Sequence, residues 1–176
     1  MDMPEVLKSS DIYKGRIFDV RIDSIREGDV EYKREIVVHK GSAVIIPVFA
    51  DNTVGLVRQY RHAAGEYMLE VPAGSLEAGE DPLEGAIREL EEEVGVVAAK
   101  VEKLSEFYVS PGFLTEIMHL YLATELTVTA QQLEGDELIE IERIPLADAL
   151  TMIRSGKVRD AKTIIALMQV AERFGI

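Results

Sequence analysis

The stretch that decides the fold is residues 74–96, which reads GSLEAGEDPLEGAIRELEEEVGV. Apolar residues recur within it at helical spacing, at Leu83, Ala86, Ile87, Leu90 and Val94. Asp81 stands where a helix N-cap is expected, and Pro82 follows at the first helical position. Gly95 supplies the left-handed residue that commonly ends a helix. The pattern therefore predicts a helix over about 82–94, preceded by a glycine-bearing loop.

Three carboxylates are spaced to share one broad face of this helix. Glu89 and Glu93 are four residues apart, and Glu92 is three residues from Glu89. Arg88 precedes Glu92 by four residues and is expected to pair with it. Clustered carboxylates stay ionised at neutral pH most readily when cations lie among them, and oxygen ligands favour Mg²⁺ or Mn²⁺ over zinc. The alternatives are a metal site suited to phosphoryl chemistry and a merely solvated acidic face.

The rest of the chain predicts strands on both sides of the helix, followed by two further helices. A hairpin is expected over 12–40, with its turn at 26–29. Further strands are expected at 42–49, 54–61, 67–71, 101–109, 117–123 and 138–144, and helices at 146–154 and 160–173. This order of elements predicts an α+β fold with a mixed sheet.

Composition narrows the class of protein. The 176 residues suffice for one hydrophobic core, and the net charge of −13 argues against a nucleic-acid or anionic-membrane binder. Because the protein is this acidic, an anionic substrate would need a bound cation between it and the protein. The chain has no cysteine, which excludes disulfides and thiolate chemistry and fits the cytoplasm, the location we expect. No export signal or membrane-spanning run is visible.

The helix and its flanks resemble the Nudix box. Nine constrained positions match over 23 residues: Gly74, Glu80, Arg88-Glu89-Leu90, Glu92-Glu93 and Gly95-Val96. The resemblance implies a Nudix-type α/β/α sandwich and hydrolysis of a nucleoside diphosphate linked to another group. It further implies two or three Mg²⁺ or Mn²⁺ ions held by the side chains of Glu89, Glu92 and Glu93 and the carbonyl of Ala73. Glu80 and Arg88 would then support the helix that carries the ligands.

The flanking segments resemble the ADP-ribose pyrophosphatase branch of this family. Pro111 lies sixteen residues after Gly95, and 58–61 and 69–74 also look like that branch. The resemblance implies that ADP-ribose is converted to AMP and ribose 5-phosphate. It implies substrate contacts by Arg61, Ser110, Glu116, Arg34 and Phe18, with Phe18 stacking on adenine and Arg34 reaching into a partner's site.

The general base is expected on the acidic loop 131–140. By resemblance Glu137 is the first candidate for base or loop metal ligand, and Glu134 is the second. Glu93 is expected to be essential for turnover as a ligand. The loop departs from the Asp-Glu-Asp-Glu pattern common in the branch, which leaves these roles open.

The predicted organisation is an antiparallel β extension at 1–40 and a Nudix hydrolase domain at 41–176. By resemblance the extension joins two copies in a homodimer that acts on a small molecule. Three other functions stay open: a pyrophosphatase for a nucleotide sugar such as GDP-mannose, a non-catalytic Nudix-like binding module, and an acidic structural domain without a ligand. The intact carboxylate set argues against the binding module, and the spacing of the box argues against the structural domain.

Overall fold

The computed structural model describes residues 3–133, 135 and 138–176. The chain forms two compact units. The first contains the residues up to Gly41 together with Phe107–Met118, and the second contains Ser42–Glu106 and His119–Ile176. The first unit thus includes a segment that the expected division at residue 40 leaves in the other domain.

The first unit is built on a three-stranded antiparallel sheet in the order β1-β2-β3. The strands are β1 (Glu5–Lys14), β2 (Asp19–Glu27) and β3 (Val30–Val38). Glu27 pairs with Val30, so the β2–β3 turn has two residues, and Gly28 adopts the positive φ of 59° that such turns require. The predicted hairpin is confirmed. Strand β1 was not predicted, because residues 5–11 are mostly polar and lack a clear period.

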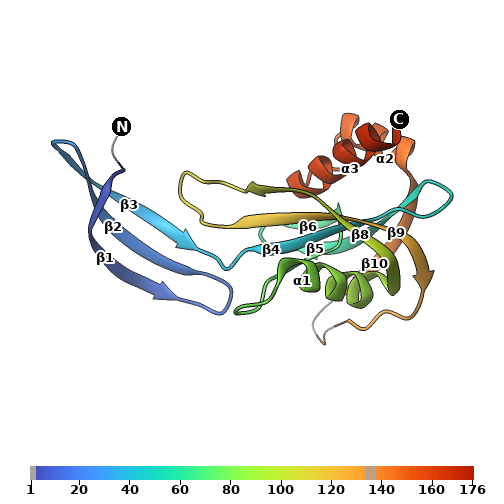
Figure 1. Ribbon diagram of the computed structural model, residues 1–176, viewed down its shortest axis with the longest axis horizontal. Coiled ribbons are helices and arrows are strands. Elements are labelled where there is room, and N and C mark those ends of the chain that lie inside the picture. The colour runs from blue at the N-terminus through green and yellow to red at the C-terminus, as the bar shows by residue number, and fades with distance from the viewer. Residues whose placement is uncertain (1–2, 134, 136–137) are drawn as a thin grey trace. The chain divides into compact units, whose positions relative to one another are not determined.

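The second unit holds two sheets, in the orders β10-β5-β6 and β7-β4-β9-β8. Their strands are β4 (Ser42–Pro47), β5 (Thr53–Arg61), β6 (Glu66–Glu70), β7 (Ala73–Ser75), β8 (Val96–Tyr108), β9 (Ile117–Val128) and β10 (Ile139–Pro145). Helix α1 (Pro82–Glu89) lies on one side of these strands, and α2 (Leu146–Arg154) and α3 (Ala161–Phe174) lie on the other (Figure 1). The predicted α+β class, with helices on both sides of the strands, is confirmed.

The core of the second unit explains why its strands form where they do. All six residues of β4 are buried, as its unbroken apolar run predicts. Leu56, Leu90, Leu120 and Leu167 are fully buried and come from strands and helices on both sides. In the described part of the chain, none of the helices has the length and apolar character that crossing a bilayer requires.

The box helix begins and ends where predicted, but its last turn has a different form. The Asp81 side chain accepts a hydrogen bond from Leu83 N at 2.8 Å, which confirms the N-cap. Residues Leu90–Val94 form a turn of π-helix, labelled η1, where a continuing α-helix was predicted. Single π turns inside helices occur frequently at functional sites. Of the apolar residues at helical spacing, Ala86, Leu90 and Val94 are buried, whereas Leu83 is 38% exposed.

Gly95 ends the π turn in a left-handed conformation that residues with a side chain rarely adopt. Its φ is 65°, and a Cβ atom there would lie 2.7 Å from Gln131 N and 2.9 Å from Ala130 C. We expect Gly95→Ala to lower the free energy of unfolding by about 1–3 kcal/mol, measured by urea denaturation. Gly112→Ala is the matched control, because a Cβ there meets open space. Equal stability of the two variants would contradict this account.

Candidate active site

Arg88 is the centre of the charged cluster on the box helix. Its Nε donates to Glu80 Oε1 at 3.0 Å, and its Nη1 donates to Glu89 Oε1 at 2.7 Å and to Glu92 Oε2 at 2.9 Å. The predicted pair with Glu92 is therefore present. The bond to Glu80, with help from Glu89 and Glu92, raises the pKa of Arg88 far above its ordinary value. The guanidinium is thus a permanent cation among three carboxylates.

Glu80 ties the loop before the helix to the helix itself. Its Oε2 accepts a hydrogen bond from Glu77 N at 2.8 Å, while Oε1 receives the bond from Arg88. The Arg88 hydrogen bond lowers the pKa of the Glu80 carboxyl, which keeps it ionised at neutral pH. Glu80 thus folds back over the helix to reach Arg88, and its contacts fix the loop that precedes Asp81.

Glu89 and Glu93 are the buried carboxylates of the cluster, at 7% and 3% exposure. Glu93 Oε2 accepts a hydrogen bond from Ala73 N at 3.0 Å, which joins the π turn to β7. Glu89 lies directly against Gly74, where a Cβ atom would be 1.8 Å from Glu89 Oε1. Only glycine permits this approach, because any larger residue would displace the carboxylate.

The donor set fits a hard divalent cation. It consists of carboxylate oxygens, two of them on buried side chains, with the Ala73 backbone beside them and no sulfur or imidazole. In the described residues, however, no three His, Cys, Asp or Glu side chains are grouped as one ion would need. The expected ligands Glu89 and Glu92 bond to Arg88 instead, and Glu93 bonds to Ala73 N.

A second charged cluster joins the ends of β5 and β6 to the start of α3. Arg61 Nε and Nη2 donate to the two oxygens of Glu70 at 2.8 and 2.9 Å. Lys162 also pairs with Glu70, and its Nζ lies 3.1 Å from Asp160 Oδ2. Glu70 is only 2% exposed. Sequence reasoning named Arg61 but assigned no role to Glu70, its buried partner, or to Lys162, which shares that carboxylate.

The charges of this cluster decide which groups are ionised. Burial by itself raises the pKa of Glu70, but Arg61 and Lys162 outweigh burial and hold it below its ordinary value. The pKa of Arg61 is raised by Glu70 and, at longer range, by Glu93. The two clusters therefore act on each other through the electrostatic field of Glu93. Glu70 lies in the segment 69–74, whose resemblance to the ADP-ribose pyrophosphatase branch could have pointed to this residue. No sequence pattern indicated a role for Lys162.

The other predicted substrate contacts belong to the first unit. The Ser110 carbonyl accepts bonds from Phe113 N and Leu114 N, so the loop is a tight turn. Glu116 Oε1 lies 3.7 Å from His39 Nδ1. The Arg34 guanidinium and the Phe18 ring contact nearby tyrosines. Their roles stay predictions, and the predicted bases Glu134 and Glu137 lie outside the described residues.

The buried pair of Arg61 and Glu70 predicts a specific pH dependence. We expect Glu70→Gln to lower the free energy of unfolding at pH 7 by about 3–5 kcal/mol, because Arg61 and Lys162 lose their counter-charge. The folded-state pKa of Glu70 is depressed, so its contribution is present above its ordinary value of 4.5 and is lost as pH falls below it. Denaturation curves from pH 7 to pH 3 should show the two proteins converging.

Glu66→Gln on the same strand is the matched control. Its partner Arg159 is 57% exposed, so we expect a change below about 1 kcal/mol. A Glu70→Gln variant that behaves like this control would contradict the assignment of a strong buried pair.

Comparison with known proteins agrees with this geometry. The NUDIX domain family matches residues 39–167. The chain is 38% identical over 166 residues to the ADP-ribose pyrophosphatase of Bacillus subtilis (strain 168), covering 93% of this chain and 90% of that protein. It is 38% identical to the methanol dehydrogenase activator of Bacillus methanolicus, with the same coverage. It is 36% identical to the GDP-mannose pyrophosphatase of Citrobacter koseri (strain ATCC BAA-895 / CDC 4225-83 / SGSC4696), covering 81% of this chain and 80% of that protein.

A solved structure shares the fold. The crystal structure of an ADP compounds hydrolase superposes with a TM-score of 0.87 at 24% identity, covering 99% of this chain and 96% of that one. The box geometry, the family match and the shared fold lead to one conclusion: the chain belongs to the NUDIX family.

Proposed function

We propose that this protein hydrolyses the pyrophosphate bond of ADP-ribose, releasing AMP and ribose 5-phosphate. The observation that carries the proposal is the packing of the Glu89 carboxylate against Gly74, beside Glu93 and within the reach of Arg88. The relative named ADP-ribose pyrophosphatase supports the choice of substrate. A cytoplasmic location is part of the proposal, because the chain has no cysteine to be oxidised.

The box residues divide into ligands and supports. Glu89, Glu92, Glu93 and the Ala73 carbonyl would hold two or three Mg²⁺ or Mn²⁺ ions, which neutralise the pyrophosphate and activate water when bound. Arg88 holds the Glu89 and Glu92 carboxylates in place, and Glu80 holds Arg88. The backbone N–H of Ala73 fixes one oxygen of Glu93.

Arg61 is suited to bind a phosphate oxygen of the substrate. Its Nε and Nη2 are engaged by Glu70, so the bidentate pair fixes the plane of the guanidinium. Among the described residues no hydrogen-bond partner of the Nη1 group is seen, so its donors can meet another acceptor. Glu70 and Lys162 then act as positioning residues for Arg61. We assign the general base to Glu137, with Glu134 as the second candidate, and the remaining substrate contacts to Ser110, Glu116, Arg34 and Phe18.

A second candidate substrate is a nucleotide sugar, because one relative is named GDP-mannose pyrophosphatase. Turnover should be measured at pH 8 with Mg²⁺ on ADP-ribose, GDP-mannose, ADP-glucose, NADH and diadenosine polyphosphates, with products resolved by chromatography. We expect ADP-ribose to be preferred and to yield AMP. Preference for another compound would keep the metal chemistry and reject the substrate assignment. No turnover by a folded protein would favour a binding module.

Two variants of the π turn make the test specific. Glu93→Gln removes a predicted ligand, and we expect kcat to fall at least about 100-fold with the fold intact. Glu91→Gln makes the same change of charge in the same turn and should retain kcat within about twofold. Wild-type kcat for Glu93→Gln would overturn the metal assignment.

We also propose that the first unit joins two copies of the chain. None of its described residues is a buried large apolar side chain, while Val6, Ile12, Ile17, Val30 and Phe113 are each more than 50% exposed. A hollow of about 300 Å³ on this unit is lined mainly by apolar side chains, among them Ile12, Ile36 and Phe113. An exposed apolar hollow of this kind is typical of a protein–protein interface.

Light scattering during gel filtration at micromolar concentration tests the proposed homodimer. We expect a mass twice the 19.6 kDa of one chain. Ile12→Asp should shift the protein toward the monomer, because it places a charge in the apolar hollow. Val128→Asp is the control, since Val128 is 70% exposed on the second unit. A monomeric wild-type protein would refute the proposal.

A further inference from the structure

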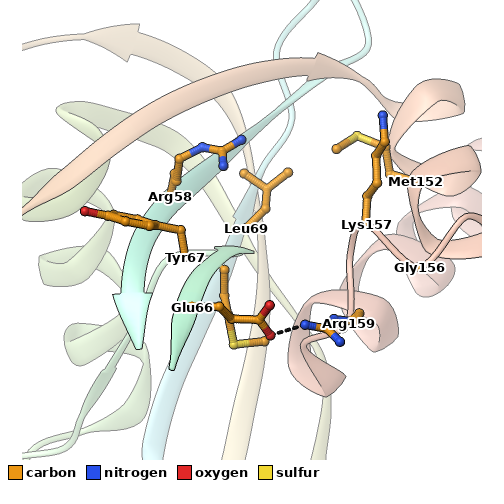
Figure 2. A pocket seen from close by; sticks show the side chains of 9 residues that line it. Arg58, Glu66, Tyr67, Leu69, Met152, Gly156, Lys157 and Arg159 are labelled. Atoms are coloured by element: carbon orange, nitrogen blue, oxygen red, sulfur yellow. Dashed lines mark hydrogen bonds and ion pairs between the residues drawn. The ribbon is translucent and has the colours of Figure 1, made fainter. Parts of the chain in front are cut away.

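A pocket of the second unit lies outside the box cluster. It has a volume of about 460 Å³ and is formed by β5, β6, the end of α2 and the connection from α2 to α3 (Figure 2). Arg58 and Leu69 project from the strands, while Met152, Lys157 and Arg159 form the facing wall. None of the residues that line it belongs to the cluster around Arg88.

Three cations line this pocket, and each retains donors for a ligand. Arg58 uses only Nε in its bond to Glu142 on β10, at 2.6 Å. Arg159 is held by Glu66 through Nη2 alone. Lys157 has no ion pair within the part of the chain that the structure describes. The remaining guanidinium N–H groups and the ammonium group are therefore available to an acceptor.

The charge of the pocket opposes that of the whole chain. The protein carries −13, yet the lining holds Arg58, Lys157 and Arg159 against the single carboxylate of Glu66. The lining thus has a net charge of +2, and Glu142 offsets part of it from outside. A local excess of cations on an acidic protein attracts anions to that place rather than to the surface in general.

The pocket also offers an apolar surface beside the cations. Leu69 is 6% exposed, and Met68 and Met152 complete this side of the lining. The volume falls within the range of about 300–1,000 Å³ that is usual for small-molecule sites. Guanidinium groups match phosphate oxygens in geometry, and the positive charge of +1 that remains when Glu142 is counted favours an anion.

We propose that this pocket binds a small organic phosphomonoester, with the phosphate between Arg58, Lys157 and Arg159 and the organic part against Leu69 and Met152. The binding claim stands on the pocket alone. Its biological reading rests on the proposed function: both AMP and ribose 5-phosphate are phosphomonoesters, so the pocket would sense the products of the reaction.

Calorimetry of the full chain in EDTA tests the binding without any contribution from metal. AMP, ribose 5-phosphate, adenosine and inorganic phosphate are the probes. We expect saturable binding of AMP or ribose 5-phosphate at one site per chain, and weaker binding of adenosine and inorganic phosphate. Lys157→Gln and Arg58→Gln should each weaken the affinity about tenfold. The affinity should also fall with added salt, because the cations are partly exposed.

Two controls separate this site from the box and from general charge. Lys33→Gln makes the same change of charge in the first unit, and Glu93→Gln alters the predicted metal ligands; neither should change the affinity. Binding that Lys157→Gln leaves unchanged, or that Glu93→Gln alters equally, would overturn the proposal. So would the absence of binding at millimolar concentration, or equal affinity for inorganic phosphate. Turnover is measured separately, so failure of the proposed function would leave the binding result intact.

Discussion

The three-way contact of one guanidinium with Glu80, Glu89 and Glu92 is the interaction on which the site depends. Carboxylates placed this closely repel one another, and the repulsion would push the loop away from the helix. Arg88 removes that penalty, and its planar fork reaches three acceptors without large cost in geometry. The loop, the helix and the π turn are therefore held together, and Ala73 and Gly74 of β7 pack against them.

The spacing of residues close together in the sequence was enough to predict much of the loop and helix at 74–96. The N-cap at Asp81, the ending at Gly95 and the ion pair of Arg88 with Glu92 each depend on residues within a few positions of one another, where spacing decides contact. The strands of the second unit, except the short β7, were also predicted, since long apolar runs such as β4 become buried wherever they are placed. The exposed position of Leu83 shows the limit of a helical pattern that is read without its neighbours.

What the sequence could not reveal depends on contacts between distant residues. The π turn is held partly from outside the helix, because Gln132 N donates to the Glu92 carbonyl and Gln131 Nε2 donates to the Glu93 carbonyl. Lys162 meets Glu70 across 92 positions in the chain, and neither residue type suggests the other. The basic pocket also depends on distant residues. Arg58 and Lys157 are far apart in the sequence, and they share the pocket because β5 and the α2–α3 connection both line it.

The buried group of Arg61, Glu70 and Lys162 also constrains how this sequence can change over time. Replacing Glu70 alone leaves Arg61 and Lys162 without their shared counter-charge, whereas replacing all three with apolar residues of similar volume need not destabilise the fold. The intermediate genotypes between those two states are the costly ones. Glu70 is therefore expected to change only together with both cations, so aligned descendants that keep Arg61 and Lys162 should also keep this carboxylate.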